Sequence, residues 1–312
     1  MTSTADLSYS RICVTGAAGF LGSHLCDALL SMGATVVALD NFSSGSRENL
    51  IPSDRLTIIE GDIRDPEVVA QALRGALVLF HMAALANPRA CDQDIELAMD
   101  VNVNGTRTLL SCARDVRRIV FMSSVTVYGE PEFLPVNETH PINCSDPYSA
   151  TKVMGEFLVK AYCHKKRTPY TIVRNSNIYG PRQTADYLIP TLISQGISRG
   201  KIEIWDSTPT RDFLFVGDAV QAFVQAASSE GLKNRTVNLG SGEEIRAGEL
   251  ADVVSAQLGV SWRDSHRVTS GARRFVNNPG VFKSLTGWEP GVSLRDGLDK
   301  TISYWKRKLA FS

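Results

Sequence analysis

The amino-acid sequence predicts an α/β fold built on a doubly wound parallel sheet. Two observations support this prediction: short buried strands alternate with amphipathic helices over the first 176 residues, and loops rich in glycine and polar residues follow the strands. A chain of 312 residues, 43% of them hydrophobic, can bury one large core or two unequal ones. Ligands of such sheets bind outside the carboxyl ends of the strands, so the loops that follow the strands form the candidate site.

The first unit of the fold covers residues 11–40, which read RICVTGAAGFLGSHLCDALLSMGATVVALD. Residues 12–15 have the apolar, β-branched character of a buried strand, and the apolar residues of 20–32 recur at helical spacing. Gly33 would end this helix, and 34–39 is expected to be a second buried strand. The unit is therefore predicted to be a strand, a glycine-rich loop, a helix and a second strand.

Three glycines and one aspartate make this unit a candidate dinucleotide site. Gly16, Gly19 and Gly22 permit a tight turn and let the backbone approach a pyrophosphate at the positive end of the helix dipole. Asp40, at the end of the second strand, can accept hydrogen bonds from an adenosine ribose and would repel a 2′-phosphate, which favours NAD(H) over NADP(H). Glycines also mark ordinary α/β turns, but here the strand, the glycine spacing, the helix and the acidic residue agree.

The rest of the chain divides into a regular and an irregular part. Further strands are expected at 56–60, 77–81, 118–122 and 170–174, and helices at 66–73, about 94–114 and from about 147 past 158. Beyond about residue 177, helices are expected at 216–227, 247–258 and 294–306, and a strand at 236–239. We therefore expect a Rossmann-type NAD-binding domain over 1–176, to which segments of about 210–240 return. A smaller substrate-binding region over 177–312 would share a cleft with it.

Composition narrows the possible partners. The 33 basic and 33 acidic residues balance and form no long basic run, which disfavours nucleic acid. No apolar run is long enough to span a membrane, and the N-terminal MTSTADLSYS lacks the basic-then-apolar order of a signal peptide, so a cytoplasmic protein is expected. The six cysteines are scattered without a CxxC pair, which predicts free thiols and no metal site.

Tyr148 and Lys152 are the candidate catalytic pair. Residues at i and i+4 share one helical face, so the phenol and the ammonium point the same way, and a nearby cation favours a phenolate. Tyr148 is then a plausible general base or acid for a sugar hydroxyl. Ser124, just past a predicted strand, can hydrogen-bond the same oxygen. By itself this spacing arises often by chance; together with a dinucleotide loop and a serine at another strand end, it indicates catalysis.

The motifs as a set resemble the extended short-chain dehydrogenase/reductases. The resemblance is nearest to their NAD-dependent nucleotide-sugar epimerase/dehydratase branch, which includes UDP-glucose and UDP-GlcNAc 4-epimerases, and it covers nearly the whole chain. The residues that carry it are 16–22, 40–43, 61–63, 81–84, 102, 123–129, 148 with 152, 177–182, 211–213 and 287–288.

The resemblance implies a set of binding residues. NAD would be bound by residues of the glycine loop, the next three strand ends, the helix at about 94–114 and the catalytic helix: Gly16, Gly19, Phe20, Leu21, Gly22, Asp40, Asn41, Ser43, Asp62, Ile63, Ala83, Ala84, Asn102, Tyr148 and Lys152. The nucleotide sugar would be bound by Ser124, Asn177, Arg182, Arg211, Arg273 and Arg274. Arginine suits this task because its planar fork pairs with phosphate oxygens. Structural alternatives are a surface salt bridge between Arg211 and Asp212, a turn-capping role for Asp62, and a packed rather than catalytic His81.

Three departures from the family pattern lie on the sugar side. Sugar 4,6-dehydratases carry an acidic pair after the serine or threonine, where this chain has Val125 and Thr126, neither of which can act as a carboxylate acid or base. The usual glycine-rich turn is replaced by WDSTP at 205–209, and the usual aspartate near Asn278 is absent. Loop residues that could instead transfer protons are Cys144, Glu130 and Asp146.

These observations leave three functional hypotheses. The favoured one is NAD-dependent 4-epimerisation of a nucleotide-activated hexose, with a UDP-hexose as substrate. The second is an atypical dehydratase that eliminates water between C5 and C6, and the third is a catalytically idle NAD-binding regulatory protein. The intact set of Ser124, Tyr148 and Lys152 counts against the third. A homodimer is expected, because the helices at about 94–114 and 150–165 pair across the two-fold axis in the family.

Overall fold

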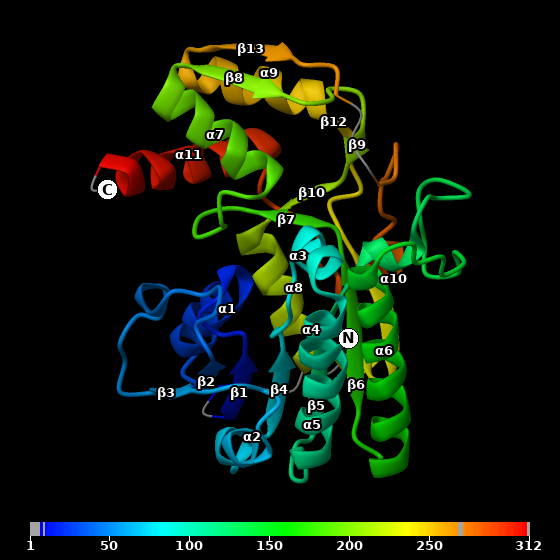
Figure 1. Ribbon diagram of the computed structural model, residues 1–312. Coiled ribbons are helices and arrows are strands. Elements are labelled where there is room, and N and C mark those ends of the chain that lie inside the picture. The colour runs from blue at the N-terminus through cyan, green and yellow to red at the C-terminus, as the bar shows by residue number, and fades with distance from the viewer. Residues whose placement is uncertain (1–6, 9, 268–270, 311–312) are drawn as a thin grey trace.

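The computed structural model describes residues 7, 8, 10–267 and 271–310. Most of the N-terminal segment that was compared above with a signal peptide, residues 1–6 and 9, lies outside this range. The centre of the structure is a seven-stranded sheet, with strands in the order β3-β2-β1-β4-β5-β6-β11, and every neighbouring pair is parallel (Figure 1). The strands are β1 (Arg11–Thr15), β2 (Thr35–Asp40), β3 (Leu56–Glu60), β4 (Val78–His81), β5 (Arg118–Ser124), β6 (Tyr170–Asn175) and β11 (Arg235–Leu239). The predicted doubly wound sheet is confirmed.

The strand order reverses between β1 and β4, which creates the crevice where such sheets bind ligands. Thr15 pairs with His81 across these two strands, so the carboxyl ends of β1 and β4 lie side by side. The loops that follow both strands therefore meet at one edge of the sheet. This is the edge at which the sequence places the candidate site.

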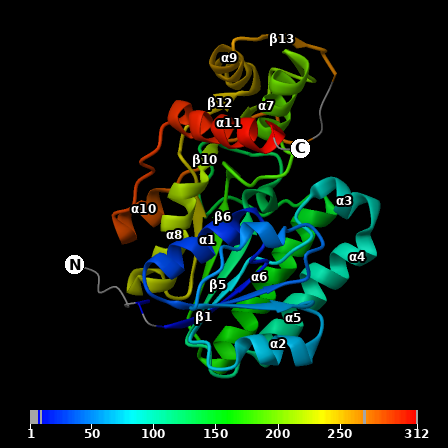
Figure 2. The same ribbon diagram turned by 90° about the vertical axis from the view of Figure 1, so that its left-hand side faces the viewer.

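Helices cover both faces of the sheet (Figure 2). One face carries α1 (Phe20–Ser31) and α8 (Val216–Ser228), which contact each other, and the other carries α2 (Pro66–Leu73), α5 (Gly105–Cys112) and α6 (Pro147–Lys166). Alternate side chains of β1 point to opposite faces: Ile12 and Val14 join one buried core, and Cys13 joins the other. Burial on both faces explains why the strands are nearly continuous apolar runs.

The helix expected at about 94–114 is interrupted. It consists of α4 (Ile95–Met99), a π-helical turn (Asp100–Asn104) and α5. A short helix that the sequence did not predict, α3 (Pro88–Gln93), comes just before it and is capped by the Asn87 side chain. A π-helical turn widens the helix locally, and such turns often occur at functional sites. Here the turn contains Asn102, one of the predicted cofactor residues.

The remaining elements lie mostly beyond the carboxyl edge of the sheet. We call α7 (Leu188–Arg199), β8 (Lys201–Ile204), β9 (Thr210–Arg211), β12 (Ile245–Arg246), α9 (Ala247–Leu258), β13 (Ser261–Asp264) and α11 (Leu294–Ala310) the cap region (Figure 1). Beside it run the paired β7 (Asn177–Tyr179) and β10 (Phe213–Phe215), and α10 (Gly280–Thr286) packs against β11. The short helices are η1 (Arg47–Asn49), η3 (Val125–Tyr128) and η4 (Glu230–Leu232). None of the described helices is long and apolar enough to cross a lipid bilayer.

Candidate active site

The glycine loop between β1 and α1 is built for close backbone packing. Gly16 has φ +67°, and a Cβ there would lie 2.8 Å from the backbone nitrogen of Ala83, which follows β4. A Cβ on Gly22 would lie 2.1 Å from the carbonyl oxygen of Gly16. Only glycine fits at these two positions, because a larger residue would push the loop away from β4 or from α1.

The N-terminus of α1 is free to bind an anion. In the described chain no side chain caps Gly19, and the first turn contains no acidic residue. The N–H groups of Phe20, Leu21 and Gly22 have no partner within the helix, as at any helix start. Gly19 faces outward, since the only atom within 4 Å of a Cβ there would be the Gly16 carbonyl oxygen. Phe20 is half-buried and Leu21 is buried in the core. Their backbone N–H groups, rather than their side chains, are therefore available to a pyrophosphate.

Asp40 lies at the end of β2 and is buried. One carboxylate oxygen accepts from Ala18 N at 2.8 Å and the other from Phe42 N at 2.8 Å. These bonds fix the carboxylate beside the glycine loop, and each oxygen keeps a lone pair for a ribose hydroxyl. This placement agrees with the predicted role of Asp40.

The loops after β2 and β3 carry further residues predicted to bind NAD, on the side of its adenine. Asp62 accepts from Asn41 and forms a two-point ion pair with Arg64, which lowers the pKa of Asp62 to about 2. Asp62 also accepts from Arg64 N, so the turn-capping role is present, and its contact with adenine stays a prediction. Ser43 N donates to Asn41, and Ile63 is buried in the core, where only its backbone is available to a ligand.

The middle of the crevice is lined by residues that follow β4. Ala83 and Ala84 are half-buried, and Ala83 N donates to Thr15 Oγ1. Asn102 is fixed by three bonds: its oxygen accepts from Leu85 N, and its amide donates to Leu85 O and to Thr151 Oγ1. Asn102 therefore joins the loop after β4 to α6. Its predicted contact with the cofactor is retained as a proposal.

His81 is a packed histidine, as the sequence indicated. Its two ring nitrogens are bonded to Thr15 Oγ1 at 2.9 Å and Thr106 Oγ1 at 2.8 Å. Burial lowers the pKa of His81 to about 3, and the charge of Lys152 adds to this effect. The ring is therefore neutral at physiological pH and has no free nitrogen for catalysis.

Ser124 and Tyr148 meet at the carboxyl end of β5. Ser124 accepts hydrogen bonds from the backbone N–H of Thr126 at 3.2 Å and from its hydroxyl at 3.0 Å, and its side chain is near enough to Tyr148 to lower the pKa of that phenol. Asp146 caps α6 by accepting from Ser149 N, so the helix that carries Tyr148 starts beside this serine. Ser124 and Tyr148 thus lie near each other, and their joint action on a sugar hydroxyl stays a prediction. Thr126 was not predicted, and it occupies part of the segment where dehydratases resembling this chain carry acidic residues.

Lys152 is buried below Tyr148 on the same face of α6. Its ammonium donates to Met122 O at 3.0 Å and lies 5.6 Å from the centre of the Tyr148 ring. Burial lowers the pKa of Lys152 to about 8. Burial also raises the pKa of Tyr148 well above its ordinary value, and the bond to Ser124 offsets this rise only in part. Stabilisation of the phenolate by the Lys152 ammonium stays a prediction.

A buried polar network behind Ser124 was not predicted from sequence. Arg174 on β6 forms a two-point ion pair with Glu156 on α6, at 2.8 and 2.6 Å, and both side chains are at most 4% exposed. Ser123 donates to Glu156, and Arg174 donates to the Tyr128 hydroxyl. The network ties β5, β6, α6 and η3 together around the catalytic serine. Its members are far apart in the chain, so no local pattern reveals it.

Three of the predicted substrate arginines lie together in the cap region. Arg211 is mostly buried and donates to the carbonyl oxygens of Thr210 at 2.7 Å and Ala272 at 2.8 Å. Arg273 donates to Asp206 at 2.7 Å, and its charge and that of Glu130 both act on Arg211. Arg274 forms an exposed two-point ion pair with Glu244.

The proposed salt bridge between Arg211 and Asp212 is absent. Asp212 is fully buried, and its carboxylate accepts from Ser241, Gly242 and Asn277 instead. Because Asp212 is used to join these loops, the guanidinium of Arg211 remains available to an anion. The alternative of a surface salt bridge is therefore wrong.

Two predicted substrate residues have other structural contacts. Asn177 is exposed at the start of β7, where its amide donates to Asp212 O at 3.3 Å. Arg182 forms an ion pair with Asp27 on α1 at 2.7 Å, which separates its guanidinium from the other three arginines. The structure does not bring Arg182 together with them, and its role in substrate binding stays a prediction.

The three loop residues named above as alternative proton-transfer groups are placed less favourably for catalysis than Tyr148. Cys144 is exposed, and the carboxylate of Asp146 is occupied by its bonds to Ser149. Glu130 accepts from the backbone N–H of Arg273 at 3.2 Å, which places it among the cap arginines. Of the three, Glu130 lies beside the predicted substrate arginines, whereas the charge of Asp146 acts on Tyr148.

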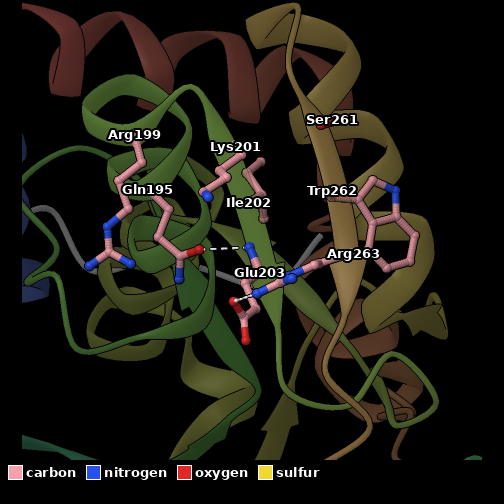
Figure 3. Close-up of a pocket in the computed structure, with 8 residues that line it drawn as sticks. All are labelled: Gln195, Arg199, Lys201, Ile202, Glu203, Ser261, Trp262 and Arg263. Atoms are coloured by element: carbon pink, nitrogen blue, oxygen red, sulfur yellow. Dashed lines mark hydrogen bonds and ion pairs between the residues drawn. The ribbon is translucent and has the colours of Figure 1, made fainter.

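A separate hollow of about 120 Å³ lies between α7, β8 and β13 (Figure 3). Its lining includes Gln195, Lys201, Trp262 and Arg263, and the figure shows Arg263 paired with Glu203. None of its lining residues belongs to the predicted site, and none is placed to act on Tyr148. The hollow is a feature of the cap surface rather than of the catalytic crevice.

The residues that line the crevice are suited to binding NAD. The glycine loop offers free N–H groups at the start of α1, and Asp40 is fixed beside them. At the other end, Asn175 is paired with Ser124 in the sheet, and its side-chain oxygen is buried without a partner in the described chain. An amide acceptor without a partner suits a ligand that supplies a carboxamide N–H. Sequence reasoning missed Asn175 because only the fold places it next to Ser124.

Comparison with known proteins agrees with this geometry. Residues 12–240 match the family model described as the NAD dependent epimerase/dehydratase family. The UDP-glucose 4-epimerase of Mycolicibacterium smegmatis is 34% identical over 317 residues, which cover 96% of this chain and 99% of that protein.

Two solved structures share the whole fold. The Thermus thermophilus UDP-glucose 4-epimerase in complex with NAD is 29% identical, with a TM-score of 0.87 over 95% of this chain and 99% of that one. DesIV, a dTDP-glucose 4,6-dehydratase from Streptomyces venezuelae with NAD and TYD bound, is 30% identical, with a TM-score of 0.90 over 96% and 98%. Taken with the glycine loop and the Ser124, Tyr148 and Lys152 set, these matches show that the chain belongs to the NAD-dependent epimerase/dehydratase family and is an NAD-dependent enzyme.

Proposed function

We propose that the enzyme epimerises a UDP-hexose at C4 through a transient 4-keto sugar. The observation that carries this proposal is the placement of Ser124 and Tyr148 together at the carboxyl end of β5, with the Lys152 ammonium 5.6 Å from the centre of the Tyr148 ring. These groups supply what oxidation and reduction of a sugar hydroxyl require from a protein.

The proton transfers follow from this geometry. In its phenolate form, Tyr148 takes the proton of the 4-hydroxyl as the C4–H bond breaks, and the resulting phenol returns this proton to O4 when C4 is reduced again. NAD, when bound, supplies the hydride acceptor for the first step and the hydride donor for the second. Ser124 donates to O4 and stabilises the negative charge that develops there. Turning the keto sugar between the two steps exposes its other face, which inverts C4 and leaves the composition of the substrate unchanged.

Thr126 favours epimerisation over elimination. Its hydroxyl and backbone N–H both bond to Ser124, so this segment supports the catalytic serine. Elimination additionally requires an acid and a base directed at C5 and C6. Val125 is apolar and buried, and Thr126 has no carboxylate.

The cap arginines are suited to the diphosphate of the substrate. Arg211 keeps free N–H groups after its two bonds to carbonyl oxygens, because a guanidinium has five donors. Arg273 lies close enough for its charge to act on Arg211, and two neighbouring cations favour a doubly charged ligand. UDP is the nucleotide we propose, because the M. smegmatis relative is a UDP-glucose 4-epimerase.

A dehydratase is the second candidate. Its support is the similarity to DesIV and the position of Glu130, a carboxylate beside Arg211 and Arg273. In this reaction water would be lost between C5 and C6 before C4 is reduced. Glu130 would then have to reach the sugar when substrate binds.

We also propose a homodimer. Met154 and Phe157 on α6 and Ile95 and Leu97 on α4 are exposed apolar residues, and α4 contacts α6. A two-fold axis beside these helices would cover such a surface in both copies. Sedimentation at micromolar concentration should show a species of twice the 34.0 kDa chain mass. A monomer alone under these conditions would contradict the proposal.

The function is tested with a panel of UDP- and dTDP-hexoses and the purified enzyme supplied with NAD. We expect a UDP-hexose to be converted to a product of the same mass that differs at C4, as read by mass spectrometry and NMR. A product lighter by one water would decide for the dehydratase. Binding of NAD without turnover of any member of the panel would contradict both reactions.

A further inference from the structure

Ser124 lies in a short segment, residues 123–128, that is held at both of its ends. At one end, the hydroxyl of Ser123 on β5 donates to Glu156 Oε1 at 2.7 Å. At the other end is Tyr128, the last residue of η3, whose side chain is fully buried. The segment therefore has one anchor just before Ser124 and a second anchor at the end of the turn that follows it.

The Tyr128 hydroxyl is bonded on both sides. It accepts from Arg174 Nη1 at 2.9 Å and donates to Asn238 Oδ1 at 2.6 Å. Arg174 on β6 and Asn238 on β11 are paired in the sheet, so the hydroxyl is fixed relative to two neighbouring strands. Burial raises the pKa of Tyr128, so the phenol keeps its proton and remains a donor at neutral pH.

The turn η3 connects this anchor to Ser124. Thr126, within η3, donates to Ser124 Oγ through both its N–H and its hydroxyl. A hydroxyl oxygen accepts two hydrogen bonds, so these contacts occupy it and leave the Ser124 O–H as the group that can point to a ligand. The Thr126 carbonyl in turn accepts from Gly129 N at 3.1 Å, directly after Tyr128. The direction of the Ser124 O–H therefore depends on where η3 is held.

The buried ion pair of the network joins the two anchors. Arg174 donates to Tyr128 at one end of the segment, and its two-point partner Glu156 accepts from Ser123 at the other end. A buried ion pair often stabilises a fold no more than apolar residues of the same volume would. Its charge-assisted hydrogen bonds, however, hold their partners in fixed directions. The contacts of this pair thus favour a role in orienting the segment over a role in stability alone.

We propose that Tyr128 is a positioning residue for Ser124: its hydroxyl, held between Arg174 and Asn238, fixes η3 so that the Ser124 O–H points at O4 of the sugar. This inference rests on the proposed function, in which Ser124 donates to O4 of a nucleotide-activated hexose. Without the Tyr128 hydroxyl, η3 shifts at its far end. The donor is then misdirected when negative charge develops on O4.

The kinetic test uses Tyr128→Phe, which keeps the buried ring and removes the hydroxyl. For the preferred sugar of the panel, kcat should fall about 10-fold, because a donor to the transition state is misdirected. KM and the affinities for UDP and NAD should change less than about 2-fold, since the interaction is made only in the transition state. Asn238→Ala removes one partner of the same hydroxyl and should give the same pattern, so the assignment stays testable if Tyr128→Phe does not fold.

Tyr179→Phe is the matched control. Tyr179 is as deeply buried as Tyr128, at 2% against 0% exposed, and its hydroxyl donates to Leu294 O at 3.2 Å, outside the network. Both substitutions remove one buried hydrogen bond, but Tyr179→Phe should leave kcat within about 2-fold of the wild type. Equal values of kcat in the two variants would overturn the positioning role.

A double-mutant cycle shows whether Tyr128 acts through Ser124. In a Ser124→Ala background, Tyr128→Phe should lower kcat by less than about 2-fold, because the group that it positions is already gone. An undiminished loss of about 10-fold in that background would contradict the proposal. Both epimerisation and water loss require oxidation at C4, so this cycle decides the role of Tyr128 whichever reaction the panel reveals.

Amide hydrogen exchange separates this inference from the proposed reaction. The Thr126 N–H is bonded to Ser124 Oγ, so its exchange with deuterated water reports on η3 without turnover. In the NAD-loaded enzyme, Tyr128→Phe should speed exchange in the peptide that contains Thr126 by about 5-fold or more, and Tyr179→Phe should leave it as in the wild type. If no sugar of the panel is converted, the proposed reaction fails and this comparison alone decides whether Tyr128 fixes η3. Wild-type exchange in Tyr128→Phe contradicts the positioning role whether or not the enzyme turns over.

Discussion

The sheet region and the cap region build their parts of the site in different ways. At the carboxyl edge of the sheet, the glycine loop predicted to bind the pyrophosphate and the Asp40 carboxylate predicted to bind the ribose come from one stretch of 30 residues, and Asp40 is fixed by the N–H of Ala18. In the cap region, Arg273 pairs with Asp206, 67 positions away, and Arg211 donates to Ala272, 61 positions away. The cofactor half is thus encoded locally in the backbone, and the substrate half depends on long-range pairs of side chains.

This difference has a functional consequence. A loop held by backbone packing, such as Gly16 against Ala83, changes little when neighbouring side chains change. A cluster held by surface ion pairs can change one partner at a time at small cost to stability. The two halves should therefore respond separately to substitution, and the four predictions below test them.

The largest effect is expected in the sheet region, from Tyr148→Phe. Removing the phenol should slow turnover by about 10²- to 10⁴-fold, because a positioned acid/base group is lost, and should leave NAD binding nearly intact. Lys152→Ala should damage both, since its ammonium is buried under the phenol and is the predicted ligand of the nicotinamide ribose. Turnover and NAD titration of both variants provide the measurement. A Tyr148→Phe enzyme with most of its activity would refute the catalytic role.

The second-largest effect is expected on the free energy of unfolding, through the buried polar network behind Ser124. Glu156→Ala leaves Arg174 buried without its carboxylate partner, which should lower the free energy of unfolding by about 3–5 kcal/mol. Glu60→Ala removes the partner of Arg47 in an ion pair exposed by more than half on both sides, and should cost less than about 1 kcal/mol. Urea unfolding of the two variants makes the comparison. Equal costs would mean that the buried network does not hold β5, β6 and α6 together.

The cap region is tested with two arginines that differ in their partners. Arg211→Ala should weaken UDP binding by about 10- to 100-fold, the range for hydrogen bonds to a charged group, without changing NAD affinity. Arg274→Ala should change UDP binding by less than about 3-fold, because its fork is already occupied by Glu244 on the surface. Isothermal titration with UDP and with NAD separates the two halves. A loss of NAD affinity in Arg211→Ala would contradict the division drawn between them.

The smallest expected effect is a pH dependence of the free energy of unfolding, caused by His81 in the sheet region. Burial holds the pKa of His81 at about 3 in the folded state, against about 6.5 in the unfolded chain. Its contribution to stability is therefore fully present above pH 6.5 and is lost as the pH falls from there toward 3. Between pH 6.5 and 5.5 this amounts to about 1 kcal/mol.

Urea unfolding at these two pH values checks the His81 effect against the variant His81→Asn. The variant has no imidazole to titrate, so its stability should fall less over the same interval. The comparison uses the difference between the two pH values, because the substitution itself also costs stability. Identical pH slopes for the two proteins would show that His81 does not contribute.

Prediction from sequence succeeded where structure is local. The strand β3, the helices α2 and α9 and the starts of α1, α8 and α11 lie at the residues expected from periodicity and from proline and glycine signals. The elements that were missed are short or set by distant contacts. α3 has six residues and the strands of the cap region have two to four, which is too few to show a period. The π-helical turn interrupts a continuous helical pattern at Asn102, whose side chain bonds to α6.

The residues of the candidate site were likewise predictable where their sequence signal is local. The glycine loop, Asp40 and the Ser124, Tyr148 and Lys152 set were predictable because strand ends and i, i+4 spacing can be read from sequence. Thr126, Glu156, Arg174 and Asn175 were not predicted. Their importance arises only when β5, β6 and α6 come together. Spacing also does not reveal the burial that raises the pKa of Tyr148.

The central claim is that this site oxidises and reduces C4 without moving protons at other carbons. It is tested most directly by converting the preferred UDP-hexose in deuterated water and analysing the product by mass spectrometry and NMR. The account predicts an isomer of unchanged mass with no deuterium at C5 or C6, because Tyr148 exchanges protons only with O4. A product lighter by one water, or one with solvent deuterium at C5 or C6, would contradict it.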